Sequence, residues 1–267
     1  MIHNLDSDFE SLLSHNWHPE FVFFDPGMMT VAGIVGSTGL VGSRILAILN
    51  ENPSITKIHS LSRRPPLAPK TASTNSLAET KLNSLTLADS SEWPLELSTV
   101  TPTPTIFFSA LGTTKAAAGS VAIQRQIDYE LNLSLAKSAK EIDAKVYVLI
   151  SSAGANSKSL LPYPKMKGEL EDAVQKLGFK TVVILRPGLL LGDRAESRPA
   201  EWAVRKFAGI VGLLGQGATD FWAQDAAVVA QAAVSAGLTA LKEDKGSTWE
   251  LTQADIVKMG RHEEQNK

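Results

Sequence analysis

The sequence predicts an α/β fold built on a doubly wound parallel sheet with a small C-terminal cap. From Met29 onward, short apolar runs rich in β-branched residues alternate with helical patterns. Apolar runs of this length between helices are typical of βαβ units, whose parallel strands are buried on both faces. After Gly188 the composition changes to a mixture of charge, tryptophan and glycine, which predicts the cap.

The bulk composition excludes several classes of protein. The chain has 267 residues, of which 43% are apolar and 20% charged, as in an ordinary globular domain. A formal net charge of −2 gives no electrostatic reason to expect nucleic acid as a partner. The chain has no cysteine, which excludes disulfides and thiolate metal sites. No apolar run reaches the length of about 20 residues that spans a bilayer.

We divide the chain into an N-terminal extension, residues 1–28, and one dinucleotide-binding domain, residues 29–267, in which residues 189–267 form the cap. The extension holds five acidic residues and neither lysine nor arginine. Secretory signals and transit peptides are basic, so this composition is not typical of either. We expect the extension to be loosely attached to the body.

The expected elements follow one another in a regular order. Strands are predicted at residues 30–35, 56–62, 83–88, 105–111, 145–152 and 180–188. Helices are predicted at residues 40–50, 120–141, 161–178 and 223–241. The strands alternate with helices, so each strand after the first is expected to join the sheet in parallel.

A glycine-rich loop, "GSTGLVG", directly follows the first strand and opens the first helix. Glycines spaced three apart allow a tight turn, a close approach of backbone to a pyrophosphate, and close packing of helix on strand. The helix N-terminus adds free N–H groups and a partial positive charge. We therefore predict a Rossmann-type dinucleotide site made by Gly36, Ser37, Thr38, Gly39, Leu40, Val41 and Gly42.

The second strand ends in arginines rather than in an acid. NAD sites usually carry an acid about 20 residues beyond the glycine motif, where it binds the ribose 2′-hydroxyl. No acid occurs between Glu51 and Glu79, and Arg63 and Arg64 stand in the expected place. Guanidinium groups suit a 2′-phosphate, so the predicted cofactor is NADPH/NADP. A solvated basic turn is the alternative.

Tyr163 and Lys167 lie one helical turn apart, on the face that also carries the apolar stripe through Met166, Leu170 and Val174. A buried cation is costly unless it has a partner. A lysine beside a tyrosine favours the phenolate and is expected to lower the tyrosine pKa from its usual value of about 10. The spacing predicts an acid–base pair. A snorkelling lysine under a half-buried tyrosine is the structural alternative.

Two serines, Ser151 and Ser152, end the strand that precedes this helix. Because the carboxyl ends of parallel strands line the cofactor crevice, we expect one of these serines to meet Tyr163 there. In a regular strand the two side chains point to opposite faces. Alternation alone leaves both serines as candidates.

The glycine loop, the strand-end serine, the Tyr-x3-Lys spacing and "RPG" at 186–188 together resemble the short-chain dehydrogenase/reductase superfamily over residues 30–192. The stretches "ALGTTKAAAGS", "YPKMKGELE" and "LRPGLLLGDRAESRPAEWAVRKF" are similar to its atypical branch, typified by the human Tat-interacting oxidoreductase-like protein. That branch includes fungal relatives assigned to the mitochondrial outer membrane. The extension departs from these relatives, which begin near Met29.

The resemblance implies roles for individual residues. Ser152 precedes "AGA", as the family's catalytic serine often does, and would bind the carbonyl oxygen together with Tyr163. Tyr163 would pass the proton, and Lys167 would also hold the nicotinamide ribose. The further cofactor contacts that the resemblance implies are Asp89 near the adenine, Ser109, Ala110, Leu111 and Gly112 under the cofactor, and Pro187 and Gly188 near the nicotinamide.

We therefore predict an NADPH-dependent oxidoreductase that transfers a hydride to or from a small-molecule carbonyl or alcohol substrate, with no metal and no nucleic acid involved. The alternative is a catalytically silent NADPH-binding scaffold or regulatory protein at the mitochondrial surface. The resemblance alone implies peripheral membrane association on the cytoplasmic side of the mitochondrial outer membrane. An epimerase-like cycle would retain NAD, which Arg63 and Arg64 disfavour.

Overall fold

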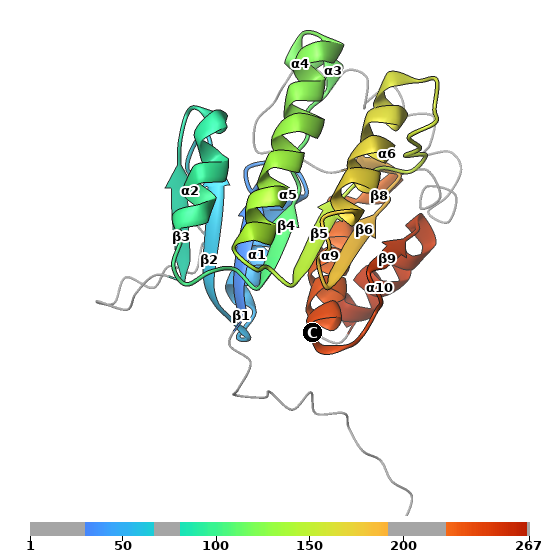
Figure 1. Cartoon of the computed structure of the whole chain (residues 1–267). Coiled ribbons are helices and arrows are strands. Elements are labelled where there is room, and N and C mark those ends of the chain that lie inside the picture. Colours follow the sequence, from blue (N-terminus) through green and yellow to red (C-terminus); the bar gives the residue numbers. More distant parts are fainter. Residues whose placement is uncertain (1–29, 67–80, 192–222, 266–267) are drawn as a thin grey trace, which may run out of the picture.

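The computed structural model describes residues 30–66, 81–191 and 223–265 (Figure 1). Its main sheet has seven parallel strands in the order β3-β2-β1-β4-β5-β6-β9, and β7 and β8 form a separate parallel pair. The strands are β1 (Thr30–Val35), β2 (Ile55–Ser62), β3 (Leu82–Thr86), β4 (Ile106–Ser109), β5 (Val146–Ile150), β6 (Thr181–Leu185), β7 (Leu189–Leu191), β8 (Ala223–Asp225) and β9 (Thr248–Leu251). The predicted α/β fold with a parallel sheet is confirmed.

Helices cover both faces of this sheet. α1, α9 and α10 lie on one face, and α2, α5 and α6 lie on the other (Figure 1). The helices are α1 (Gly42–Glu51), α2 (Trp93–Thr99), α3 (Lys115–Ala118), α4 (Val121–Arg125), α5 (Asn132–Glu141), α6 (Pro162–Gln175), α9 (Ala226–Lys242) and α10 (Gln253–Gln265), together with the 3₁₀ turn η1 (Ser90–Glu92) and the π-helical segment η2 (Gln126–Leu131).

The central strands are buried on both faces because each supplies side chains to two separate cores. Ile106 and Phe108 of β4 pack in the core under α1 and α9, whereas Phe107 between them packs in the core under α2, α5 and α6. All three are fully buried. Burial of side chains of this size stabilises a fold by about 1.5–3 kcal/mol each.

The strand order has a switch point between β1 and β4. On one side of it β2 and β3 follow β1, and on the other side β5 and β6 follow β4. In open parallel sheets this switch point opens a crevice at the carboxyl ends of the strands, where ligands bind. The glycine loop follows β1 directly and therefore lies at this crevice.

From α9 onward, the described part of the expected cap packs in the layers of the main sheet, whereas β7 and β8 form the separate pair. β9 pairs with β6, with Val182 opposite Thr248, and completes the sheet. α9 packs on β5, β6 and α1, and its Val229 and Val234 are buried in the core. β9, α9 and α10 therefore extend the two layers that the preceding strands and helices form. The rest of the expected cap, residues 192–222, and the expected extension lie outside the described residues.

The long helix expected at residues 120–141 consists of three parts. α4 passes into the π-helical segment η2, which passes into α5. In a π-helical segment each backbone hydrogen bond spans five residues instead of four, and such segments are frequent at functional sites. No residue pattern distinguishes it from the flanking helix.

Candidate active site

The turn between β1 and α1 leaves no room for a side chain at two of its glycines. Gly36 has φ +81°, and a Cβ atom there would lie 2.5 Å from the backbone of Ala110. A Cβ atom on Gly42 would lie 2.1 Å from the carbonyl oxygen of Gly36. The N–H of Gly39 donates to the same oxygen at 2.9 Å. The first turn of α1 thus approaches the strand end closely, as a backbone cradle for a pyrophosphate requires.

The remaining residues of the turn divide between core and surface. Ser37 is 1% exposed and accepts a hydrogen bond of 2.7 Å from the hydroxyl of Ser60. Val41 is buried in the core, and Leu40 packs at its edge. Thr38 is exposed. The Thr38 side chain is therefore the one hydroxyl of the turn that is exposed to solvent.

Arg63 and Arg64 are exposed directly beyond the end of β2. The hydroxyl of Ser62 donates to the carbonyl oxygen of Arg64 at 2.7 Å, which holds the chain in a turn there. β3 pairs with β2 and ends shortly before Asp89, which is also exposed. The Asp89 carboxylate accepts the N–H of Ser91 at 2.8 Å, and this bond lowers the pKa of Asp89. The arginines and Asp89 occupy the same end of neighbouring strands.

The chain beyond β4 runs beside the glycine turn. The N–H of Ala110 bonds the last carbonyl of β1, and Gly112 is exposed. Ser109 is fully buried, and its hydroxyl donates to the side-chain oxygen of Asn132 at 2.5 Å. The Asn132 amide donates in turn to the carbonyl of Leu111 at 3.2 Å. Asn132, which fixes this segment, was not predicted from the sequence.

Ser152 and Tyr163 meet beyond the end of β5. The Ser152 hydroxyl lies near enough to the phenol of Tyr163 to lower the pKa of that tyrosine, and it donates to the carbonyl of Ala153 at 3.3 Å. The side chain of Tyr163 is 41% exposed, so this pair is open to a ligand. Ser151 points elsewhere, and its hydroxyl donates to the buried carboxylate of Glu171.

Lys167 lies one turn beyond Tyr163 in α6 and is buried. It is 3% exposed, and its ammonium donates to the carbonyl oxygen of Ile150 at 3.0 Å. Burial lowers the pKa of Lys167, whereas the charges of Asp128 and Glu171 raise it. A buried cation with a carbonyl partner and two nearby carboxylates is compensated, as burial of a charge requires.

The pKa of Tyr163 moves in the direction opposite to the expectation. Burial raises it, the contact with Ser152 lowers it, and the charge of Asp128 raises it. The net shift is upward, so the expectation that Lys167 lowers the tyrosine pKa is wrong for this structure. The physical reason is that Tyr163 is partly buried near a carboxylate, whereas the Lys167 ammonium is bonded to Ile150.

Pro187 and Gly188 follow β6 along the same edge of the sheet. The carbonyl of Pro187 accepts the N–H of Ala153 at 2.7 Å, which joins this loop to the segment after Ser152. The N–H of Gly188 donates to the side-chain oxygen of Gln224 at 3.1 Å, and Gln224 is 2% exposed. The loop therefore flanks the Ser152–Tyr163 pair.

Two buried carboxylates next to Lys167 were not predicted. Asp128 in η2 is 1% exposed, and Glu171, one turn beyond Lys167, is 2% exposed. Arg186 of "RPG" binds Glu171 at 2.7 Å and Glu250 of β9 at 2.7 Å. The i,i+4 spacing from Lys167 was a signal for Glu171. No sequence pattern indicates Asp128, because its position depends on the π-helical segment.

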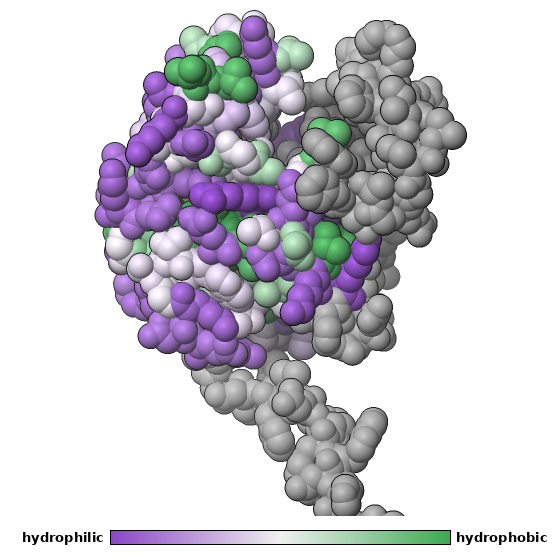
Figure 2. Space-filling view, turned by 90° about the vertical axis from the view of Figure 1, so that its right-hand side faces the viewer, coloured by the Kyte–Doolittle hydropathy of each residue, from purple (hydrophilic) through white to green (hydrophobic). Residues whose placement is uncertain are grey.

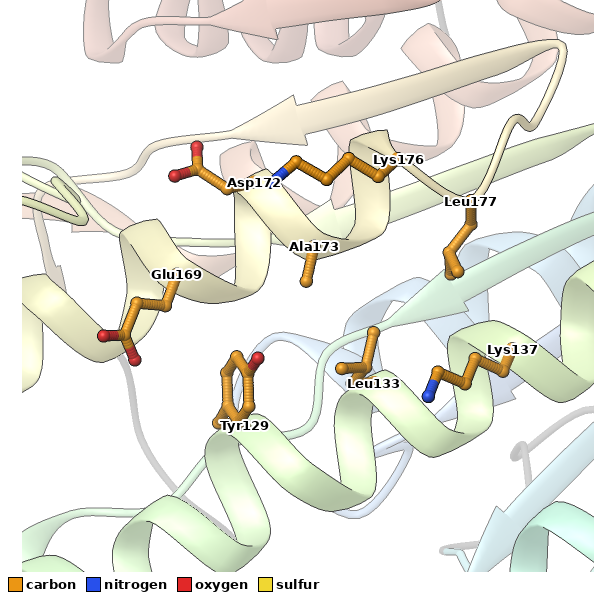
Figure 3. A pocket seen from close by; sticks show the side chains of 8 residues that line it. All are labelled: Tyr129, Leu133, Lys137, Glu169, Asp172, Ala173, Lys176 and Leu177. Atoms are coloured by element: carbon orange, nitrogen blue, oxygen red, sulfur yellow. The ribbon is translucent and has the colours of Figure 1, made fainter.

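A cavity of about 410 Å³ lies elsewhere, between the outer surfaces of α5 and α6 (Figure 3). Side chains from η2 and α5 face side chains from α6 across it. They are Tyr129, Leu133, Lys137, Glu169, Asp172, Ala173, Lys176 and Leu177. None of the predicted site residues lines this cavity, so it is separate from the strand ends.

Within residues 30–66, 81–191 and 223–265, no three histidine or acidic side chains are close enough together to hold a metal ion. In the same ranges, no helix is both long and apolar enough to cross a membrane.

The fold is that of the short-chain dehydrogenases/reductases and related sugar-nucleotide enzymes. A short chain dehydrogenase family protein from Francisella tularensis superposes with a TM-score of 0.59 at 11% identity, covering 85% of this chain and 98% of that one. MoeE5 in complex with UDP-glucose and NAD gives a TM-score of 0.59 at 16% identity, covering 86% and 81%. The UDP-glucuronic acid 4-epimerase of Bacillus cereus gives 0.60 at 15%, covering 83% and 76%.

Sequence comparison is more specific. The profile of the HIM1 family matches residues 73–211. The mitochondrial protein fmp52 of Aspergillus fumigatus is 50% identical over 236 residues, which are 87% of this chain and 99% of that protein. The corresponding Neurospora crassa protein is 43% identical over 243 residues, or 88% and 96%. The chain therefore belongs to the HIM1 family and to the family of fungal Fmp52 proteins, whose members are named as mitochondrial.

Proposed function

We propose that this protein binds NADPH and transfers a hydride between the nicotinamide and the carbonyl or alcohol carbon of a small molecule, with Tyr163 as general acid or base. The observation that carries the proposal is the convergence of Ser152, Tyr163 and Lys167 at the edge of the sheet that also holds the glycine turn. Acid–base groups and a dinucleotide cradle at one switch point suit hydride transfer.

The residues of the cradle fit the proposed cofactor. A backbone turn that is too tight for Cβ atoms at Gly36 and Gly42 suits a bound pyrophosphate. Exposed guanidinium groups at Arg63 and Arg64, in place of an acid, favour NADPH over NADH. The other proposed cofactor contacts are Ser37, Thr38, Gly39, Leu40 and Val41 in the turn, Asp89, Ser109, Ala110, Leu111 and Gly112 beyond β3 and β4, and Tyr163, Lys167, Pro187 and Gly188 near the nicotinamide.

The protein's own groups would act on the oxygen of the substrate. When bound, NADPH supplies the hydride that the carbonyl carbon accepts. The hydroxyls of Ser152 and Tyr163 would bind the carbonyl oxygen, and Tyr163 would donate its proton as that oxygen becomes a hydroxyl. Lys167, held by Ile150, would position the tyrosine and the ribose. In the reverse direction Tyr163 would accept the proton.

The structural neighbours act on or bind nucleotide sugars with NAD. The arginine pair argues for a different cofactor here, and the substrate is proposed only as a small carbonyl or alcohol compound. The relatives' names support a mitochondrial location. Peripheral attachment to the cytoplasmic side of the outer membrane is a proposal that the resemblance suggests.

One observation favours a second candidate, an NADPH-dependent scaffold without turnover. Leu160 is 100% exposed and Leu161 is 66% exposed, immediately before α6. Figure 2 shows a hydrophobic patch at the upper end of the molecule, the end that holds α3, α4 and the start of α6 in Figure 1. Apolar surface of this kind is frequent where a protein partner binds. The scaffold would need the cofactor cradle but not the phenol of Tyr163.

The test is NADPH oxidation by the purified protein with a panel of aldehydes, ketones and quinones. Tyr163→Phe should reduce turnover at least about 100-fold, the usual contribution of a general acid, while NADPH affinity stays within about twofold. Tyr129→Phe, which changes a tyrosine on the outer cavity, is the matched control and should be neutral. Equal turnover in Tyr163→Phe would refute the catalytic role. NADPH binding without turnover on any carbonyl, with full cellular rescue by Tyr163→Phe, would favour the scaffold.

A further inference from the structure

Four aliphatic side chains are exposed at the end of the molecule that holds α4 and the start of α6 (Figures 1 and 2). They are Val121 (39% exposed), Ile123 (45%), Leu160 (100%) and Leu161 (66%), and we call them the apolar patch. Val121 and Leu160 line one pocket of about 350 Å³, so the two chain segments lie side by side. Exposed apolar surface with a polar rim marks a contact with a protein or a membrane.

Hydrogen bonds hold the loop that presents Leu160. The N–H of Asn156 donates to the carbonyl of Pro164 at 2.9 Å, and the N–H of Ser159 donates to the carbonyl of Asn156 at 2.9 Å. The N–H of Leu161 donates to the hydroxyl oxygen of Ser159 at 3.1 Å. The fold therefore keeps Leu160 in solvent, although burying a side chain of this size would stabilise it.

Basic side chains surround the apolar patch. Residues 113–127 and 151–168, which carry the patch, contain no acid. The cations that these residues place at the surface are Lys115, Arg125, Lys158 and Lys165. Arg125 and Lys165 share the carboxylate of Glu169, at 2.6 Å and 4.0 Å. Within the described residues, no ion pair involves Lys115 or Lys158, so positive charge is in excess at this end.

This combination favours an acidic lipid surface over a protein as the partner. Protein interfaces are enriched in aromatic residues and methionine and depleted in lysine, whereas the patch consists of aliphatic side chains between lysines. Aliphatic side chains enter the boundary between headgroups and acyl chains, and lysines reach the phosphates of the headgroups. Each lysine near an acidic membrane surface also gains electrostatic attraction. Charge complementarity thus selects membranes with acidic headgroups.

We propose that the apolar patch and its cations dock this end of the protein on a bilayer that contains acidic phospholipids. The basis is the composition and geometry of this surface, and not the location of the relatives. Docking of this kind needs no spanning helix, because side chains that enter only the headgroup boundary make reversible contacts.

Docking would bring the proposed active site to the membrane surface, because Tyr163 follows Leu161 by two residues and is 41% exposed. For the proposed function, on which this consequence rests, the favoured substrates are carbonyl compounds that dissolve in a bilayer, such as long-chain aldehydes. A nucleotide sugar is charged and soluble in water, so it gains nothing from this arrangement.

The test is flotation of the full chain with vesicles of phosphatidylcholine alone and of phosphatidylcholine mixed with phosphatidylserine. The native protein should float with the mixed vesicles, and added salt should weaken its binding, as for any surface charge. Leu160→Ser/Leu161→Ser should weaken binding at least about tenfold, since it removes the apolar contacts. Lys115→Gln/Lys158→Gln should weaken binding to the mixed vesicles about tenfold or more, and should leave the residual binding to phosphatidylcholine unchanged.

Leu95→Ser is the matched control, because Leu95 is 72% exposed in α2, over the part of the sheet that holds β2 and β3 (Figure 1). Its binding should stay within about twofold of the native value. Failure of the native protein to float with the mixed vesicles would overturn the inference and leave the apolar patch to a protein partner. Equal effects of Leu95→Ser and Leu160→Ser/Leu161→Ser would overturn it as well.

Turnover separates this inference from the proposed function. With mixed vesicles present, Leu160→Ser/Leu161→Ser should lower kcat/KM for a long-chain aldehyde and leave kcat/KM unchanged for the short-chain, water-soluble homologue. Equal losses for both aldehydes would contradict delivery of the substrate from the bilayer. Absence of turnover on any carbonyl would refute the proposed function without changing the flotation results.

Discussion

Lys167 is tied to Ile150, the last residue of β5, by a hydrogen bond of 3.0 Å from its ammonium to the backbone carbonyl. The bond joins the first turns of α6 to the strand end from which Ser152 extends. It therefore holds the first turns of α6, which carry Tyr163, against the strand end that Ser152 follows. The lysine, which is 3% exposed, thus has a structural partner before any ligand is bound.

Gly36→Ala should lower the free energy of unfolding and abolish NADPH binding. Its Cβ would lie 2.5 Å from the Ala110 backbone, in addition to the strain of φ +81°. Gly178→Ala is the matched control, because Gly178 has φ +75° but open space around its Cβ position. Both variants carry the left-handed strain of about 1–2 kcal/mol. Gly36→Ala should lose about 1–3 kcal/mol more in urea unfolding, and equal losses would argue against a tight cradle.

The two carboxylates that share Arg186 should differ in their contribution to stability. Glu171 is 2% exposed, whereas Glu250 is 43% exposed, and each lies 2.7 Å from the guanidinium. Glu171→Ala should lower the free energy of unfolding by about 3–5 kcal/mol, because it breaks a buried pair. Glu250→Ala should cost about 0–1 kcal/mol, as for an exposed pair. Denaturant midpoints measure both, and a larger effect at Glu250 would contradict the structure.

His59 should make stability depend on pH below about 6.5. The ring is fully buried, with Nε2 2.9 Å from the Pro102 carbonyl and Nδ1 3.0 Å from the Asn83 amide, so it is neutral when folded. Burial lowers its pKa, the bond to Pro102 raises it, and Lys57 lowers it. With the folded pKa below the unfolded value, the stability is complete above about pH 6.5. It is lost as the pH falls through the folded pKa.

Urea unfolding between pH 5 and 7.5 measures this dependence, with His59→Gln as the reference that lacks it. The native protein should lose up to about 1.4 kcal/mol per pH unit relative to the variant in this range. Carboxylates contribute equally to both proteins and cancel in the difference. Parallel curves for the two proteins would show that His59 is not held neutral by the fold.

The cofactor preference should reside in the arginine pair. Arg63→Ala/Arg64→Ala should weaken NADPH binding about tenfold or more, since bonds between charged groups are worth about 1.5–3 kcal/mol. NADH binding should stay unchanged, because NADH has no 2′-phosphate. Lys145→Ala/Lys176→Ala, which removes two exposed charges at the other end of β5 and α6, is the control for general electrostatics. If calorimetry finds that the double variant loses equal affinity for NADPH and NADH, the arginines do not bind the 2′-phosphate.

Much of the fold could be predicted from the sequence because buried parallel strands are local apolar runs. The expected strand at residues 30–35 coincides with β1 (Thr30–Val35), and β2 through β6 differ by a few residues at their ends. β9 (Thr248–Leu251) and α2 (Trp93–Thr99) were not predicted, because both are short and mix polar with apolar residues. Their formation depends on packing against β6 and α5.

The site could be predicted only where its residues follow each other in recognisable spacing. The glycine turn and the pair of Tyr163 and Lys167 are motifs of this kind. Asp128 and Asn132 have no such spacing, and a π-helical segment brings them to the strand ends. The sign of the Tyr163 shift depends on burial and on Asp128, so the sequence alone predicted the wrong direction.

The central claim is that this chain is an NADPH-binding protein with a preference for the 2′-phosphate. Parallel calorimetric titrations of the purified protein with NADPH and NADH test it most directly. We predict micromolar affinity for NADPH and at least tenfold weaker binding of NADH, a difference of the size that one charge-assisted contact produces. Binding of neither nucleotide would contradict the account, because the glycine loop would then be only a turn between strand and helix.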